Sequence, residues 1–194
     1  MVITIPNVLS IIRILLVAVF CISYFRPGML VFALIIIIIS GITDLLDGYI
    51  ARKYNQISDL GKILDPIADK LFQLSTVVCF VISGAVPYWA VIIIFVKELV
   101  MLIGAFVYYN RSEVVIGAKW YGKLASSLFF LSFLTVFFFQ IMEGSLEVSA
   151  LAHIVINIMF ILSISVSLFA TVNYIALAYK TYSKNKIDRN QEPK

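Results

Sequence analysis

Long uninterrupted apolar runs constrain the fold of this chain more than any other feature. Six of them cover residues 6–25, 29–53, 60–84, 87–109, 118–142 and 149–181. A helix needs about 20 mostly apolar residues to cross the hydrocarbon core of a bilayer. Hydrophobic residues make up 62% of the chain and charged residues only 13%, whereas a soluble domain has about 45–50% and about 25%. We therefore expect an all-α integral membrane protein with six transmembrane helices.

The basic residues predict how these spans are oriented. One set of connections carries Arg52 with Lys53 and Arg111 with Lys119, and the C-terminal segment adds further lysines. Connections rich in Lys and Arg stay on the cytoplasmic side of the membrane. We therefore expect a multi-pass protein of the cell membrane with both termini in the cytoplasm. Residues 1–182 would form one membrane domain, and the polar tail at 183–194 would be frayed.

Acidic residues gather between the second and third spans. The stretch "DLLDGYIARKYNQISDLGKILDPIADK", residues 44–70, holds five of the 11 acidic residues of the chain. At helical spacing its polar and small residues form two stripes, one on each side of a turn. The first stripe contains Asp44, Asp47, Gly48, Ala51 and Arg52, and the second contains Gly61, Asp65 and Asp69. A helical hairpin would bring the two stripes together at the cytoplasmic mouth of the spans.

Four converging carboxylates repel one another unless cations lie between them. Hard divalent ions such as Mg²⁺ or Mn²⁺ prefer oxygen ligands, and two of them can share four carboxylates. Such a two-metal site is a recurring arrangement for displacement at phosphorus. Gly48 and Gly61 would let a phosphate or nucleotide approach the backbone, and Arg52 could bind phosphate with its guanidinium fork. Asp59, off both stripes, is interpreted as a solvated surface residue.

Other functions are compatible with acidic residues near spans. Solvated charges at helix ends would explain one or two of the aspartates, but not two stripes with glycines and an arginine in phase. A divalent-metal transporter would also carry carboxylates within its spans. Its ligands would be expected near mid-membrane in two related halves, and no second copy of the stretch occurs. A purely structural membrane protein would leave the stretch unexplained.

The acidic stretch resembles the motif of the CDP-alcohol phosphatidyltransferase family, D-xx-D-G-xx-A-R-x8-G-xxx-D-xxx-D, and meets every spacing in it. The resemblance implies transfer of a substituted phosphate from a CDP-linked donor, usually CDP-diacylglycerol, to an alcohol, with release of CMP. It implies that Asp44, Asp47, Asp65 and Asp69 hold the metals. It further implies that Asp69 takes the proton of the attacking hydroxyl.

The same resemblance implies a donor site formed by Gly48, Arg52 and Ser58, to which Gly61 and Asn7 are added. Membrane lipid would supply the donor, and members of the family are often homodimers. No nucleic-acid partner is expected.

The start of the chain bears on the acceptor alcohol. "IPNVLSIIR" resembles the opening common in phosphatidylglycerophosphate synthases and CMP-forming cardiolipin synthases, with Asn7 and Arg13 at the matching polar positions. Glycerol 3-phosphate is the acceptor we expect, and phosphatidylglycerol is the alternative. A phosphate-bearing acceptor needs cations. The candidates are Lys97, Lys123, Lys119, Arg111 and Arg13; Arg13 could instead be a structural partner of an aspartate, and Lys119 and Arg111 could be cytoplasmic anchors.

Overall fold

The computed structural model describes residues 5–53, 59–109 and 120–191, which form six helices and no strand. The side chains of most of these residues are described as well. The helices are α1 (Ile5–Phe25), α2 (Leu30–Lys53), α3 (Asp59–Ile82), α4 (Tyr88–Tyr109), α5 (Trp120–Glu143) and α6 (Ala150–Gln191). The all-α prediction is thus confirmed for the described ranges.

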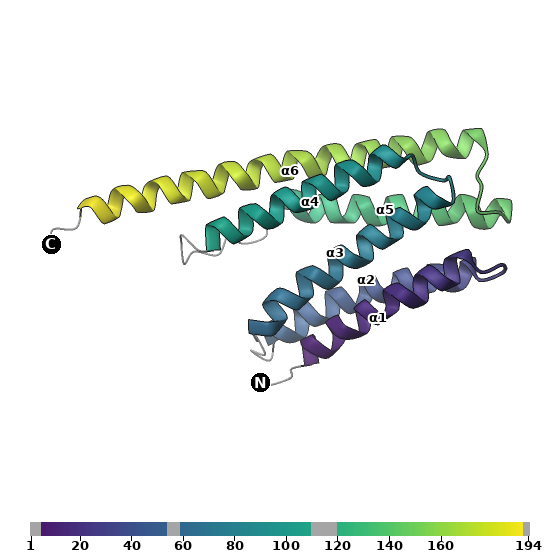
Figure 1. Ribbon diagram of the computed structural model, residues 1–194, viewed down its shortest axis with the longest axis horizontal. Helices are drawn as coiled ribbons and strands as arrows, with labels where there is room; N and C mark the ends of the chain where they lie inside the picture. Colours follow the sequence, from purple (N-terminus) through teal and green to yellow (C-terminus); the bar gives the residue numbers. More distant parts are fainter. Residues whose placement is uncertain (1–4, 54–58, 110–119, 192–194) are drawn as a thin grey trace.

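The helices run back and forth along one elongated bundle (Figure 1). The connections at 26–29, 83–87 and 144–149 lie at one end of the bundle, and both termini lie toward the other. Helix α1 packs against α2 and α3, and α5 packs against α6. The contacts of α4 with α3 and α6, and of α2 with α5, join these two groups. Residues far apart in the sequence can therefore meet between the groups.

Local sequence explains the turn between α5 and α6. Gly144 has a positive φ of 62°, a conformation that glycine adopts without the penalty of a Cβ atom. Its N–H donates to the carbonyl of Ile141, and the N–H of Ser145 donates to that of Gln140. This pair of bonds is the Schellman arrangement that ends many helices. Ser149 then caps α6, since its hydroxyl accepts from the N–H of Ala152 at 3.4 Å.

Three helices in the described part of the chain are long and apolar enough to cross a membrane. They cover Asn7–Phe25, Trp120–Glu143 and Ala150–Leu177, and a shorter apolar helix covers Leu30–Thr43. Large apolar side chains such as Leu15, Ile22 and Leu151 are exposed on the bundle surface. In a membrane these side chains would face lipid rather than water. The bundle thus has the surface of a membrane protein, while the count of six spans stays a prediction.

The expected helix boundaries agree closely with the structure except at the C-terminus. The first five helices begin and end within about two residues of the apolar runs. Helix α6, however, continues to Gln191, so the expectation of a frayed tail is wrong over 183–191. The segment carries good helix formers such as Lys and Arg and no Gly or Pro before Pro193. Polarity alone therefore did not end the helix.

A buried polar network ties three helices together near the end with the short connections. The hydroxyls of Tyr24 and Ser83 lie 2.8 Å apart, and the Gln140 amide donates to Tyr24 Oη at 2.6 Å. Gln140 also donates to the carbonyl of Leu146 at 2.8 Å. Tyr24 and Gln140 are fully buried among phenylalanine side chains that include Phe80 and Phe137. Because water cannot replace these bonds, the network stabilises the junction of α1, α3 and α5.

We predict that Gln140→Leu lowers the unfolding free energy by about 1 kcal/mol, because Tyr24 Oη and the carbonyl of Leu146 lose their donor. SDS titration in mixed micelles would measure the change. Phe138→Leu, a substitution at a lipid-facing position of the same helix, should change stability by much less. Equal effects of the two substitutions would contradict a stabilising role for the network.

Candidate active site

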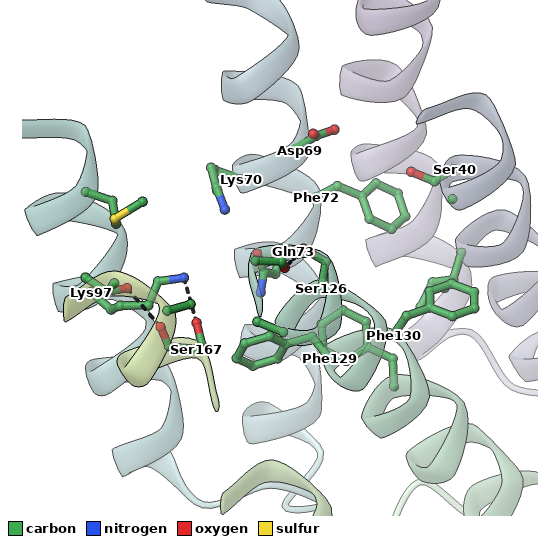
Figure 2. A pocket seen from close by; sticks show the side chains of 18 of the residues that line it. Ser40, Asp69, Lys70, Phe72, Gln73, Lys97, Ser126, Phe129, Phe130 and Ser167 are labelled. Atoms are coloured by element: carbon green, nitrogen blue, oxygen red, sulfur yellow. Dashed lines mark hydrogen bonds between the residues drawn. The ribbon is translucent and has the colours of Figure 1, made fainter. Parts of the chain in front are cut away.

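A cavity of about 400 Å³ lies between the two groups of helices, and all six helices contribute to its wall. Its charged lining comes from Arg13 on α1, Asp69 and Lys70 on α3 and Lys97 on α4, and Ser167 on α6 is one of its uncharged polar residues. Figure 2 shows the lysines reaching toward the same space from neighbouring helices, with Ser126, Phe129 and Phe130 of α5 across from them. A concave site with a few convergent polar groups is the usual form of a small-molecule site.

Arg13 and Asp69 form an ion pair at the wall of this cavity. The Arg13 side chain is 1% exposed, whereas the Asp69 side chain is 38% exposed. Arg13 lies on the buried face of α1 with Asn7 and Ser10, at spacings that fall on one side of a helix. The pair joins α1 to α3 and leaves part of the Asp69 carboxylate accessible. The sequence suggested two roles for Arg13, and the contact with Asp69 is the one expected if Arg13 is the structural partner of an aspartate.

A second charge cluster joins α3, α4 and α6. Glu98 forms ion pairs with Lys97 through Oε1 and with Lys70 through Oε2, the latter at 2.9 Å. Lys97 Nζ also donates to Ser167 Oγ at 3.1 Å. The Glu98 side chain is 5% exposed, so its charge depends on these two lysines. Both lysines line the cavity, whereas Glu98 is not part of its lining.

The opposite wall of the cavity is apolar and closely packed. Phe129, Phe130 and Phe133 of α5 line it. Gly122 allows Tyr174 of α6 to approach α5, because a Cβ atom at residue 122 would lie 2.8 Å from Tyr174 Oη. That spacing is too short for a carbon and an oxygen in contact. A Cβ atom at residue 122 would therefore make the end of the Tyr174 side chain shift.

Most of the motif predicted to bind metal and donor lies on the ends of α2 and α3. The backbone places Asp44, Asp47, Gly48 and Arg52 in α2 and Gly61 and Asp65 in α3. The side chains of these residues lie outside the described part of the structure, as do Ser58, Arg111 and Lys119 altogether. Among the side chains that are described, no group of three or more possible metal ligands occurs. The assignments at these positions stay predictions.

The structure separates the remaining candidates. Asp69, Arg13 and Lys97 line one cavity, whereas Lys123 is exposed on α5 and is not part of the described lining. Asn7 is buried near the start of α1. The roles of Lys123 in acceptor binding and of Asn7 in donor binding stay predictions.

Several polar residues of the cavity, including Lys70, Ser126 and Ser167, were not predicted from the sequence as site residues. Lys70 directly follows Asp69, but this position alone does not indicate that its side chain lines a cavity. Ser126 and Ser167 lie in apolar helices where serine often bonds to its own backbone. The contact between Lys97 and Ser167 spans 70 residues, so no local pattern could have revealed it.

Comparison with known proteins identifies a family. The profile described as CDP-alcohol phosphatidyltransferase matches residues 3–169. This range includes the whole acidic motif and all residues of the cavity lining except Ala170, Thr171 and Tyr174. The match therefore covers most of the helical bundle.

Individual relatives carry two kinds of name. A CMP-forming cardiolipin synthase of Streptomyces coelicolor is 39% identical over 110 residues, which are 53% of this chain and 50% of that protein. A CDP-diacylglycerol–glycerol-3-phosphate 3-phosphatidyltransferase of Bacillus subtilis is 34% identical over 133 residues, 61% of this chain and 68% of the relative. The protein of that name from Mycoplasma genitalium is 42% identical over 82 residues, 42% of this chain and 34% of the relative. The chain thus spans about half the length of the Streptomyces relative.

The Arg13–Asp69 contact yields a prediction about stability. In a double-mutant cycle with Arg13→Met and Asp69→Asn, we expect a coupling of about 1–2 kcal/mol in the unfolding free energy, reduced from that of a fully buried pair because Asp69 is partly hydrated. SDS titration in mixed micelles would measure it. The matched cycle pairs Arg13→Met with Glu147→Gln, at an exposed acid in the connection before α6. Additive effects in both cycles would contradict a stabilising ion pair.

Proposed function

This chain belongs to the CDP-alcohol phosphatidyltransferase family, and on that premise we propose that it transfers the phosphatidyl group of CDP-diacylglycerol to glycerol 3-phosphate and releases CMP. The observation that carries this proposal is the position of Asp69. Its accessible carboxylate lies at the wall of a cavity of about 400 Å³ that Lys70 and Lys97 also line. The cavity thus combines a group able to accept a proton with cations able to bind a phosphate.

The residues of the cavity suggest how the transfer proceeds. An acceptor whose phosphate lies against the lysines can place a hydroxyl beside Asp69. The Asp69 carboxylate accepts the proton of that hydroxyl as the oxygen forms a bond to the phosphorus of the phosphatidyl group. The bond from that phosphorus to the oxygen of CMP breaks, and CMP leaves with the electron pair. Arg13 orients the carboxylate through their ion pair.

Two divalent ions, Mg²⁺ or Mn²⁺, fit the donor chemistry of this site. Asp44, Asp47, Asp65 and Asp69 would supply the carboxylate oxygens that hard cations prefer. Helices α2 and α3, which carry these residues, both pack against α1, and the partly exposed Asp69 carboxylate is accessible to a cation. When bound, the ions would offset charge on the diphosphate and on the departing CMP. Gly48, Arg52, Ser58, Gly61 and Asn7 would hold the CDP group.

We further propose six membrane spans, cytoplasmic termini and an active site that faces the cytoplasm in the cell membrane. The common position of the two termini at one end of the bundle supports an even number of crossings. In the sequence, Arg52 and Lys53 end α2, and Arg111 and Lys119 lie between the residues of α4 and α5, as expected for cytoplasmic connections. A donor with two acyl chains suits this arrangement, because its chains can stay in the bilayer. We also propose a homodimer.

A CMP-forming cardiolipin synthase is the second candidate function. The Streptomyces coelicolor relative has that name and is 39% identical over its matched segment. Phosphatidylglycerol, the acceptor in that reaction, presents a phosphodiester with one negative charge, which a lysine can bind as a point charge. The two candidates share the donor, the reaction and the site, and they differ only in the acceptor.

We predict that purified protein with CDP-diacylglycerol and Mg²⁺ or Mn²⁺ releases CMP when glycerol 3-phosphate is added. A panel of glycerol 3-phosphate, phosphatidylglycerol, serine and inositol phosphate would test this, with CMP quantified by chromatography. Release with phosphatidylglycerol alone would replace the proposed acceptor with that of the second candidate. Folded protein that released no CMP with any acceptor would contradict the whole proposal and would restore a transporter as a candidate.

We also predict that Asp69→Asn lowers turnover by at least about 100-fold, because an amide cannot accept the proton of the attacking hydroxyl. The initial rate of CMP release would measure the effect. Asp59→Asn, the same substitution at the aspartate assigned to the solvated surface, serves as the matched control and should keep the rate within about two-fold. Near-normal turnover of Asp69→Asn would exclude Asp69 as the base.

A further inference from the structure

Glu98 is a buried acid with no place in the acidic motif. Its two carboxylate oxygens contact two different ammonium groups, those of Lys97 and Lys70. Lys97 is its neighbour on α4, whereas Lys70 comes from α3. A buried carboxylate is stable only when cations and hydrogen bonds replace its hydration. Glu98 thus restricts where both lysines can lie.

The lysines face the cavity, and the carboxylate does not. Lys70 and Lys97 belong to the cavity lining, and Glu98 lies outside it. Figure 2 shows the two lysines extending from separate helices toward the space below Asp69. Ser167 holds Lys97 from a third helix at 3.1 Å. Unlike the lysines, the carboxylate is kept away from an anionic ligand, which it would repel.

We propose that Glu98 is a positioning residue, which holds Lys70 and Lys97 so that their ammonium groups together bind the phosphate of the acceptor. This inference rests on the proposed function and deepens it, because it adds Lys70 to the acceptor site and assigns a role to Glu98. The ligand chemistry is a phosphate group on a polyol. That group can belong to free glycerol 3-phosphate or to a lipid headgroup.

Charge and hydrogen-bond capacity both fit this role. Two ammonium groups beside one carboxylate leave a net positive charge at the cavity wall. Each ammonium has three N–H donors. In the described part of the chain, Lys70 forms an ion pair with Glu98, and Lys97 forms an ion pair with Glu98 and donates a hydrogen bond to Ser167. Donors therefore remain on both lysines for phosphate oxygens, and Asp69 lies on the same wall, next to Lys70.

Because Glu98 is negatively charged, the direction of the change in the acceptor KM on its neutralisation tests the proposal. If Glu98 only offset positive charge, Glu98→Gln would make the cavity more positive and strengthen anion binding. If Glu98 positions the lysines, the same substitution lets the two ammonium groups move apart and weakens binding. The two roles predict opposite changes in the KM for the acceptor.

The experiment measures CMP release in nanodiscs as donor and acceptor concentrations are varied separately. We expect Glu98→Gln to raise the acceptor KM about ten-fold, with the donor KM and kcat changed by less than about two-fold. Glu98→Asp, which keeps the charge on a shorter side chain, should recover part of the loss. Glu147→Gln, the same substitution at an exposed acid, is the matched control and should leave all three constants unchanged. A lower or unchanged acceptor KM for Glu98→Gln would overturn the proposal.

A second variant and a binding measurement test the proposal even if Glu98→Gln does not fold or the protein releases no CMP. Lys70→Met removes a lysine that is already 36% exposed, and Lys97 still pairs with Glu98, so folding should tolerate the change. The substitution should raise the acceptor KM about ten-fold even if Glu98→Gln does not fold. An unchanged KM would overturn the proposal. If wild-type protein releases no CMP, the proposed function is contradicted, but the proposal about the phosphate site is not. Calorimetric titration with glycerol 3-phosphate and with inorganic phosphate then tests that site. Wild-type binding that weakens about ten-fold in Lys70→Met would support the site, and equal binding or none would overturn it.

Discussion

Charged side chains inside an apolar bundle must find partners of opposite sign, and this requirement organises the centre of the molecule. Arg13 is almost completely buried on α1 and pairs with Asp69 on α3. Glu98 on α4 is buried and pairs with lysines from α3 and α4. Because isolated charges in such surroundings cost several kcal/mol each, the helices that carry them cannot move apart independently. The cavity lies where these pairs meet.

The polar groups near the short connections and those around the cavity have different roles. Toward the short connections, Tyr24, Ser83 and Gln140 bond to one another within a layer of phenylalanines. These bonds close that part of the bundle. Around the cavity, by contrast, Asp69 and Lys70 remain partly exposed after pairing. Paired but accessible charges suit a site for an anionic substrate, because they are held in place and remain in contact with the cavity.

Much of this architecture could be predicted from local patterns. The apolar runs predicted the first five helices to within about two residues, since the period and length of such runs depend only on neighbouring side chains. The acidic motif indicated the family, which the profile match over residues 3–169 supports. The prediction failed at 183–191, where a polar segment continues α6. The segment contains no Gly or Pro that would break the helix, and its polarity alone does not do so.

The sequence by itself determined that the chain forms long apolar helices and carries the motif of its family, because both depend on spacing along the chain. Only the tertiary structure decided which cations surround Asp69. The sequence treated Lys97 and Lys123 alike, but the fold directs Lys97 into the cavity and leaves Lys123 exposed. It also brings Lys70 to Glu98 and Ser167 to Lys97, across 28 and 70 residues of chain. Such partners are set by how helices pack against each other, and helix packing depends on contacts that no local period contains.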